Sequence, residues 1–297
     1  MKKTLELIVC LLLTILVVLN LDKITDYIAT FFSEEKRVYI ASSNEYKKDY
    51  EFKFVKMSKE YVPYSYEALI NIIYSTLNNG WDTFTFYCPD EYTNCLKDIT
   101  KISNDTTLLS NINNFVHPFN NYSKIGIITS TTGEVTINVT KLYSDEDINK
   151  INVKVDEIIT KQITNDMSIE DKILKIHDYI INNTKYDTKK SSDNAYDAKG
   201  PLFDGVAVCS GYADLMAIFL TKFGVSNFKV ASDTHVWNAV YINNEWLNID
   251  LTWDDPVTKD SNVDTLLHQF FLVNTDTLLE FDTKDHTFDT TIYQELK

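Results

Sequence analysis

The chain has 297 residues, of which 44% are hydrophobic and 13% aromatic. This is enough for a globular core and, at roughly 150 residues a domain, for about two domains. The formal net charge is -15 at pH 7. Proteins that bind nucleic acids need a basic surface opposite the phosphates, so we expect no nucleic-acid partner.

The N-terminus predicts a membrane segment. Lys2 and Lys3 precede an apolar run from Leu5 to Leu21, which is close to the shortest helix that crosses a hydrocarbon layer about 30 Å thick. No small-residue cleavage site follows the run, so an uncleaved anchor is favoured over a cleaved signal peptide. With both lysines in the cytoplasm, the rest of the chain is expected outside the cell, anchored in the cell membrane by a single pass or secreted after cleavage. We therefore predict an anchor or signal segment over residues 1–22 and a juxtamembrane tether over residues 23–36.

Residues 37–144 have the pattern of a small α/β domain of unknown role. Alternating and helical spacings of apolar residues, with Gly80 and Gly133 in turns, set the expected elements. A partner protein for this domain is a further hypothesis, with the helix–strand unit 66–87 as its binding surface. In chain order we expect a strand at 37–41, a helix at 66–77, a strand at 83–87, a helix at 95–109 interrupted at Asn104 and Asp105, and a hairpin of strands 122–129 and 134–143.

The four cysteines do not form a disulfide framework. Cys88 and Cys95 are seven residues apart, so in an exported protein they are able to close a small loop, and otherwise they stay two free thiols. No pair of cysteines has the spacing of zinc ligands, and no cluster of histidines accompanies them, so we expect no metal and no cofactor. His117, beside Pro118, is interpreted as structural.

Residues 145–297 begin with two expected helices, at 145–164 and 170–183, the second preceded by the N-cap pattern of Ser168. The second helix carries His177 and Asp178, which we interpret as a structural pair, with a place in a site wall as the alternative. Residues 187–199 are polar and aperiodic, which favours a connecting loop; a lid over a substrate cleft is the alternative.

Cys209, His235 and Asp250 are the residue types that a thiol nucleophile needs. A thiol attacks as thiolate, an imidazole accepts its proton, and a carboxylate orients that imidazole. Cys209 opens an apolar helical run, so its thiol is expected at a helix N-terminus, where the partial positive charge favours a thiolate. The alternative for Cys209 is a buried, inert cysteine.

Two strands joined at Asn243-Asn244 would bring the histidine and the carboxylate together. In a hairpin about that turn, residues whose numbers sum to about 487 face each other, which places His235 beside residues 251 and 252 and close to Asp250. Neighbouring strands lie about 4.8 Å apart, within reach of a carboxylate–imidazole bond. Asp254 and Asp255 are alternative carboxylates. His268 and His286 show no partner in the sequence and are interpreted as structural.

Five short segments carry a family resemblance: 176–180 (IHDYI), 209–213 (CSGYA), 235–238 (HVWN), 250–256 (DLTWDDP) and 270–274 (FFLVN). Through them, residues 145–276 resemble the transglutaminase-like superfamily, whose papain-like fold has the chain order Cys, His, Asp. Ala207 departs from the family pattern, in which many members carry glycine two residues before the cysteine.

The resemblance implies Cys209 as the nucleophile, His235 as the base and Asp250 as the orienting carboxylate. The expected fold is α+β: a transmembrane helix, the small α/β domain, and over residues 145–297 a catalytic domain with the cysteine at a helix N-terminus packed on an antiparallel sheet. Tyr212, Trp237 and Trp253 are expected to wall the cleft.

The implied activity is acyl transfer to a protein or peptide substrate, outside the cytoplasm. We favour a hydrolase of peptide or amide bonds, in proteins or cell-envelope polymers. A protein cross-linking transglutaminase is the alternative, since the same triad serves an amine acceptor. A non-catalytic binding or scaffold module is the alternative from another class of protein.

Overall fold

The computed structural model describes residues 14, 20–21, 38–257 and 266–297. Residues 40–297 form one compact unit. The expected tether lies outside the described residues, and so does nearly all of the expected anchor. Among the described residues, no helix has the length and apolarity needed to cross a membrane.

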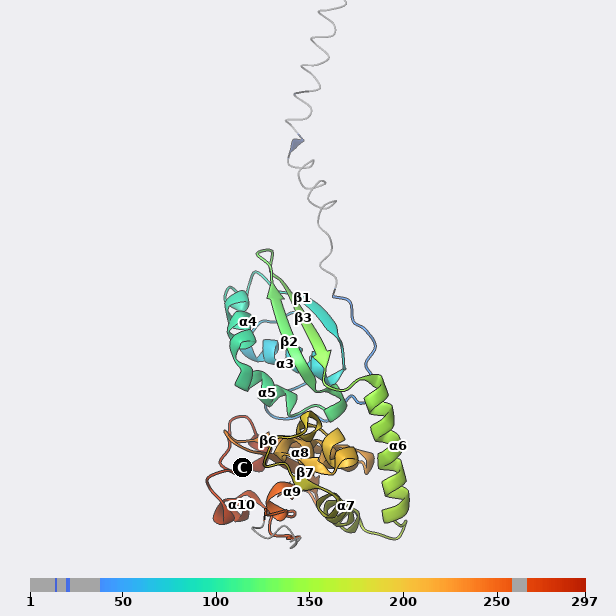
Figure 1. Cartoon of the computed structure of the whole chain (residues 1–297). Coiled ribbons are helices and arrows are strands. Elements are labelled where there is room, and N and C mark those ends of the chain that lie inside the picture. Colours follow the sequence, from blue (N-terminus) through green and yellow to red (C-terminus); the bar gives the residue numbers. More distant parts are fainter. Residues whose placement is uncertain (1–13, 15–19, 22–37, 258–265) are drawn as a thin grey trace, which may run out of the picture. The chain divides into compact units, whose positions relative to one another are not determined.

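The first half of the compact unit contains an antiparallel sheet in the order β1-β3-β2. Helix α3 packs against β3, and α4 packs against β2 (Figure 1). The helices, strands and the hairpin expected between residues 66 and 141 are confirmed, including the interruption at Asp105, which caps α5. The elements are α3 (Tyr66–Asn78), β1 (Thr83–Tyr87), α4 (Cys95–Asn104), α5 (Thr106–Asn113), the 3-10 helix η1 (Pro118–Asn120), β2 (Tyr122–Thr129) and β3 (Glu134–Lys141).

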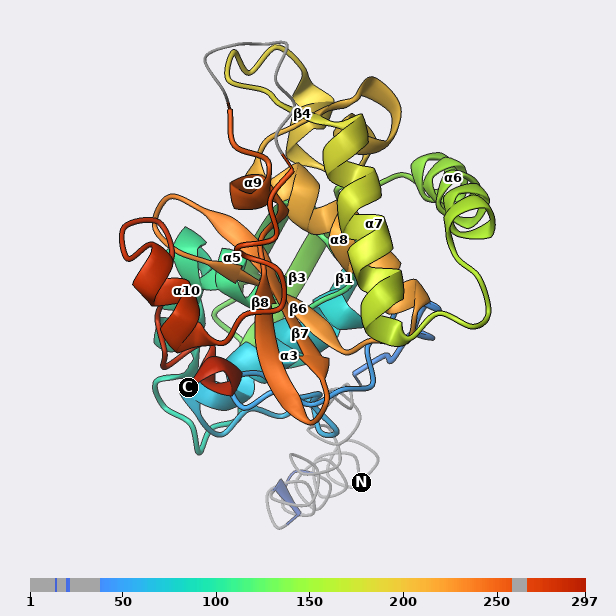
Figure 2. The same cartoon turned by 90° about the horizontal axis from the view of Figure 1, so that it is seen from below.

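The second half places a buried helix, α8 (Cys209–Lys222), against a second antiparallel sheet of order β6-β7-β8. Helix α8 contacts β6 and β7, and it also contacts α7 (Figure 2). The other elements are α6 (Asp145–Gln162), α7 (Ile169–Asn183), β4 (Lys185–Tyr186), η2 (Asp193–Tyr196), η3 (Gly200–Asp204), β5 (Val206–Ala207), β6 (Asn227–Ala231), β7 (Val236–Ile242), β8 (Glu245–Ile249), α9 (Leu251–Asp254), α10 (Thr275–Phe281) and η4 (Gln294–Leu296).

Serine side chains set where three of the helices begin. The hydroxyls of Ser65, Ser144 and Ser168 each accept a hydrogen bond from a backbone N–H in the first turn of α3, α6 and α7. Ser144 and Asp147 form a reciprocal capping box. These caps satisfy backbone donors that have no partner inside the helix.

The expectations for two segments, residues 38–41 and residues 187–199, were wrong. Residues 38–41 are not a strand: Tyr39 and Ile40 both lie exposed, at 84% and 57%, so the alternation has no sheet to pack on. Residues 187–199 are not a plain solvated connection, because they contain η2 and bury Ala195 and Ala198 completely. The Ala195 carbonyl accepts a hydrogen bond from the N–H of Val208, directly before α8.

A buried charged network joins the two halves. The carboxylate of Asp214 in α8 accepts from Lys229 Nζ in β6 at 2.6 Å and from the hydroxyl of Tyr143 at 2.8 Å. Asn121 Nδ2 donates to both carboxylate oxygens at 3.2 Å. Buried charges require partners of this kind. Side chains of both halves therefore meet at one carboxylate, and the domain boundary expected between residues 144 and 145 stays a prediction.

Candidate active site

Cys209 is the first residue of α8, as its apolar run predicted. It is a free, half-buried thiol. Gly211 allows the preceding loop to pack against this turn: a Cβ at Gly211 would lie 2.4 Å from the Ala195 carbonyl oxygen. The segment β5, which leads into Cys209, is held by pairing of Ala207 with Tyr186 in β4. The thiol thus sits on a helix start that is fixed from two sides.

The hairpin of β7 and β8 brings His235 and Asp250 together, with the predicted register. Asn238 faces Ile249 and Val240 faces Leu247, and both pairs sum to 487. His235 directly precedes β7, and Asp250 directly follows β8. His235 Nε2 lies 2.5 Å from Asp250 Oδ2. This contact leaves Nδ1 free of Asp250, and Cys209 is among the groups that raise the pKa of His235.

The electrostatics of the pair favour an imidazolium. Burial by itself would lower the pKa of His235, but the Asp250 carboxylate and Cys209 outweigh it and raise the pKa to about 10. Burial would likewise raise the pKa of Asp250, yet His235 and His286 lower it well below its usual range. At neutral pH the site therefore holds a carboxylate against a protonated His235.

Asp250 has a second histidine partner that the sequence did not reveal. Its Oδ1 accepts from the backbone N–H of Thr252 and Trp253, at 2.9 and 3.3 Å. Its Oδ2 lies 2.8 Å from Nε2 of His286, in addition to His235. The expectation that His286 lacks a partner was wrong. It lies 36 residues after Asp250, before 3-10 helix η4, and no periodic pattern connects the two positions.

Comparison with protein-family models identifies this region. Residues 156–251 match the model described as the transglutaminase-like superfamily. This part of the chain is a transglutaminase-like domain. The match contains Cys209, His235 and Asp250. No curated protein matches the chain.

Solved structures with a similarity to the chain include a TGase, which is 15% identical over 48% of this chain and 47% of that one, with a TM-score of 0.35. A candidate cysteine protease from Cytophaga hutchinsonii is 16% identical over 43% and 61%, with a TM-score of 0.28. A candidate protease from Parabacteroides distasonis is 13% identical over 44% and 40%, with a TM-score of 0.25. The chain spans between 40% and 61% of the length of these structures.

The three aromatic residues expected in the cleft wall of the transglutaminase-like domain have different positions. Trp237 is 1% exposed and stacks on His235, with ring centroids 5.9 Å apart, while its Nε1 donates to Asn248. Tyr212 is also 1% exposed and donates to Asp255 Oδ2 at 2.5 Å. Trp253 lines a cavity beside His235. Trp253 therefore lies in the wall of the cavity. Trp237 and Tyr212 are instead buried, and they contact His235 and Asp255.

The cavity beside His235 has a volume of about 340 Å³. Two carboxylates of the lining, Asp255 and Asp285, give its polar part an acidic character. Thr234 donates to Asp285 at 3.0 Å, so this carboxylate is held at the edge of the site. The lining is Tyr186, Thr234, His235, Thr252, Trp253, Asp255, Pro256, Val257 and Asp285.

His177 and Asp254 form a second histidine–carboxylate pair, separate from that of His235 and Asp250. His177 Nε2 lies 3.1 Å from Asp254 Oδ2, and both side chains are buried. Asp254 is therefore not the partner of His235, and His177 does not line the cavity beside it. His268 Nε2 lies 2.7 Å from Asp178 Oδ1. The expectation that His268 lacks a partner was wrong.

Proposed function

We propose that the protein is a cysteine-dependent acyl-transfer enzyme in which Cys209, His235 and Asp250 act as a catalytic triad. The observation that carries the proposal is the 2.5 Å contact between His235 Nε2 and Asp250 Oδ2, together with the influence of Cys209 on the pKa of His235. A thiol, an imidazole and a carboxylate in this order form an activated nucleophile.

The proposed reaction begins with the thiolate of Cys209 and the imidazolium of His235. The Cys209 sulfur attacks the carbonyl carbon of an amide, and the C=O electron pair moves to the oxygen. When the tetrahedral intermediate collapses, the C–N bond breaks and His235 gives its proton to the leaving amine. Water, deprotonated by His235, then attacks the thioester, which releases the acid and restores the thiol pair.

The start of α8 supports the oxyanion in this scheme. The first N–H groups of an α-helix have no partner within the helix, and the helix dipole adds positive potential there. Because Cys209 is the first residue of α8, we expect backbone N–H groups of this turn to donate to the developing oxyanion.

Hydrolysis of peptide or amide bonds is the favoured reaction, and transfer to a primary amine is the second candidate. The acidic residues Asp255 and Asp285 in the cavity beside His235 support the second candidate, because they would attract a cationic lysine side chain. The same charges favour neutral or basic substrates over acidic ones in either reaction.

We place the site outside the cytoplasm. Cys88 and Cys95 form a disulfide in the structure, and disulfides persist mainly in oxidising compartments. The dilysine and the apolar run at the N-terminus support the same placement, as a single-pass membrane anchor or a cleaved signal.

The first test is the alkylation of Cys209 by iodoacetamide between pH 5 and 9, followed by peptide mass spectrometry of the full chain. Cys10 is replaced by serine, and the Cys88–Cys95 disulfide is left oxidised. We expect Cys209 to react readily below pH 7, where an ordinary thiol with a pKa near 8.5 hardly reacts. His235→Ala should abolish this low-pH reaction while leaving alkylation at high pH.

His117→Asn is the matched control, because His117 caps η1 through its Nδ1 and has no part in the proposed triad. It should leave the pH profile unchanged. If Cys209 reacts like an ordinary thiol in both the unmodified chain and His235→Ala, the enzyme proposal fails and a non-catalytic module takes its place. A fluorescent alkylamine offered together with a glutamine peptide then separates hydrolysis from amine transfer.

A further inference from the structure

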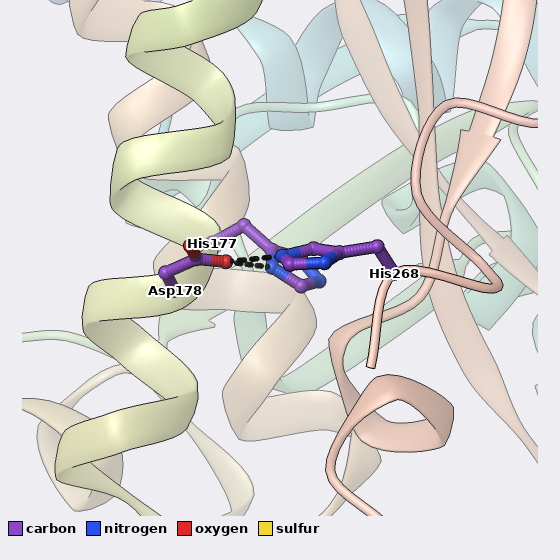
Figure 3. Close-up of side chains that lie close together, drawn as sticks. All are labelled: His177, Asp178 and His268. Atoms are coloured by element: carbon purple, nitrogen blue, oxygen red, sulfur yellow. Dashed lines mark hydrogen bonds and ion pairs between the residues drawn. The ribbon is translucent and has the colours of Figure 1, made fainter. Parts of the chain in front are cut away.

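A cluster of two histidines and a carboxylate lies between α7 and the segment that follows residue 265. His177 and Asp178 come from α7, and His268 comes from the facing segment (Figure 3). One carboxylate oxygen, Asp178 Oδ1, lies 3.0 Å from His177 Nδ1 and 2.7 Å from His268 Nε2. The proposed triad uses none of these three residues.

We propose that His177 Nδ1, Asp178 Oδ1 and His268 Nε2 bind a divalent transition-metal cation of the Zn²⁺ class. Imidazole nitrogen and carboxylate oxygen are ligands that suit Zn²⁺, and three protein ligands leave a fourth position for water. The site is independent of the proposed acyl transfer.

The ligand distances fit such an ion. All three ligand atoms lie within 4.8 Å of one another. Zn²⁺ bonds of about 2.1 Å in a tetrahedron place neighbouring ligand atoms about 3.4 Å apart. To match this spacing, the two nitrogen–oxygen distances of 3.0 and 2.7 Å would have to widen by about 0.4 and 0.7 Å.

Asp254 contacts the ring nitrogen of His177 that is not among the three proposed ligand atoms. The His177 nitrogen that faces away from the cluster, Nε2, lies 3.1 Å from the buried carboxylate of Asp254. Histidines that bind metals almost always donate their other N–H to such an acceptor, which fixes the tautomer and the ring orientation.

The cluster is closed to solvent at one histidine and open at its other two residues. His177 is completely buried, while the side chains of Asp178 and His268 are 32% and 45% exposed. Phe271 packs edge-on against the His177 ring, with centroids 5.3 Å apart, and gives the buried side an apolar wall. Solvent therefore reaches the two ligands Asp178 and His268, while the third ligand, His177, is shielded from it.

A cation here would hold the end of the hairpin in place. Asp254 Oδ1 also accepts from the backbone N–H of Phe270, and the Asp254 N–H donates to the Asp250 carbonyl. Binding His268 to α7 thus clamps the segment that follows residue 265 against α9.

The test uses Co²⁺ as a visible substitute for Zn²⁺, titrated into the full chain carrying Cys209→Ser so that no thiolate of the proposed triad binds metal. We expect saturation at one equivalent with the intense visible bands of tetrahedral coordination. His268→Ala, chosen because this side chain is half exposed, should weaken binding on the order of 100-fold or more. Asp178→Asn provides a second ligand loss.

His235→Ala is the matched control, because the described residues contain one other group with this spacing, His235, Asp250 and His286. It should leave Co²⁺ binding intact, and Zn²⁺ should raise the melting temperature of this control by several degrees but not that of His268→Ala. Three outcomes would each overturn the proposal. The first is the absence of saturable Co²⁺ binding, and the second is Co²⁺ binding that is unchanged in each of the separate variants His268→Ala and Asp178→Asn. The third is loss of Co²⁺ binding in His235→Ala.

Discussion

At the scale of single residues, Asp250 is the most constrained group of the proposed site, because it receives two backbone N–H groups and two histidines. His286 is itself held by Asp282, at 3.0 Å from its Nδ1. Its ring is completely buried. We infer that His286 is a positioning residue that fixes the carboxylate against which His235 is oriented.

Replacing His286 by leucine should slow the low-pH alkylation of Cys209 about ten- to hundredfold. The reason is that Asp250 loses one of its charge-assisted hydrogen bonds, worth about 1.5–3 kcal/mol, and is free to turn from His235. His286→Gln keeps a donor and should recover part of the rate. A purely structural role would lower the melting temperature of His286→Leu and leave the pH profile of alkylation unchanged.

The raised pKa of His235 gives a second prediction. Below about pH 10 the ring is an imidazolium beside Cys209, and above it the charge is lost. A neighbouring cation attracts anionic iodoacetate but not neutral iodoacetamide. The rate of Cys209 alkylation by iodoacetate, divided by the rate with iodoacetamide, should therefore fall as the pH rises through about 10. In Asp250→Asn the carboxylate that raises the pKa is gone while burial still lowers it, so the fall should move to lower pH. An unchanged transition in this variant would contradict the assigned cause.

The sequence located the triad candidates because each has a local signal. Cys209 opens a buried apolar helix, and His235 and Asp250 flank strands of one tight hairpin. His286, Asp282 and His268 carry no such signal, since their partners depend on how an irregular C-terminal segment folds back. Asp254 was considered only as a rival of Asp250, yet it faces His177.

At the scale of elements, the turn at Asn243-Asn244 determines whether His235 meets Asp250. Both residues have positive φ, 51° and 67°, which is the geometry of a two-residue type I′ hairpin turn. A slip of one residue would send every side chain of β8 to the opposite face. The strand register in which paired residue numbers sum to 487 therefore depends on this turn.

Asn244→Gly should leave the free energy of unfolding unchanged or raise it by a few tenths of a kcal/mol, because glycine adopts positive φ without strain. Asn244→Val should lower it by about 1–2 kcal/mol, because a β-branched residue is strained there. Urea unfolding of the two variants measures this difference. Equal stabilities would show that the register is set by strand packing and not by the turn.

Regular elements were predictable where the pattern is local. Periodicity predicted α3, α6 and α7, and Ser168 marked the start of α7. The β2–β3 and β7–β8 hairpins followed from their turns. The failures, at residues 38–41 and 187–199, depend on distant partners. Tyr39 alternates with apolar neighbours but packs on no sheet, while Ala195 lies in a polar stretch yet is buried against the turn at Gly211.

At the scale of the whole molecule, the Asp214 network is what the sequence least revealed. Asp214 interrupts an apolar helix and Lys229 an apolar strand, and both are almost fully buried, with side chains 2% and 8% exposed. The other two partners of Asp214, Tyr143 and Asn121, come from the first half of the compact unit. A charged residue inside an apolar run usually indicates an exposed face, so the pattern alone gives no hint of this contact.

Lys229→Met should lower the free energy of unfolding by about 3–5 kcal/mol, because it leaves the Asp214 carboxylate buried without its cation. Adding Asp214→Asn removes the charge while keeping an oxygen that can accept from Tyr143, so the double variant should lose less than the sum of the two single variants. A coupling of 1–3 kcal/mol from urea unfolding would establish the pair as a unit. Additive single losses below 1 kcal/mol would mean that water reaches the carboxylate, and that apolar packing of α8 on the sheet, rather than this network, holds the two halves together.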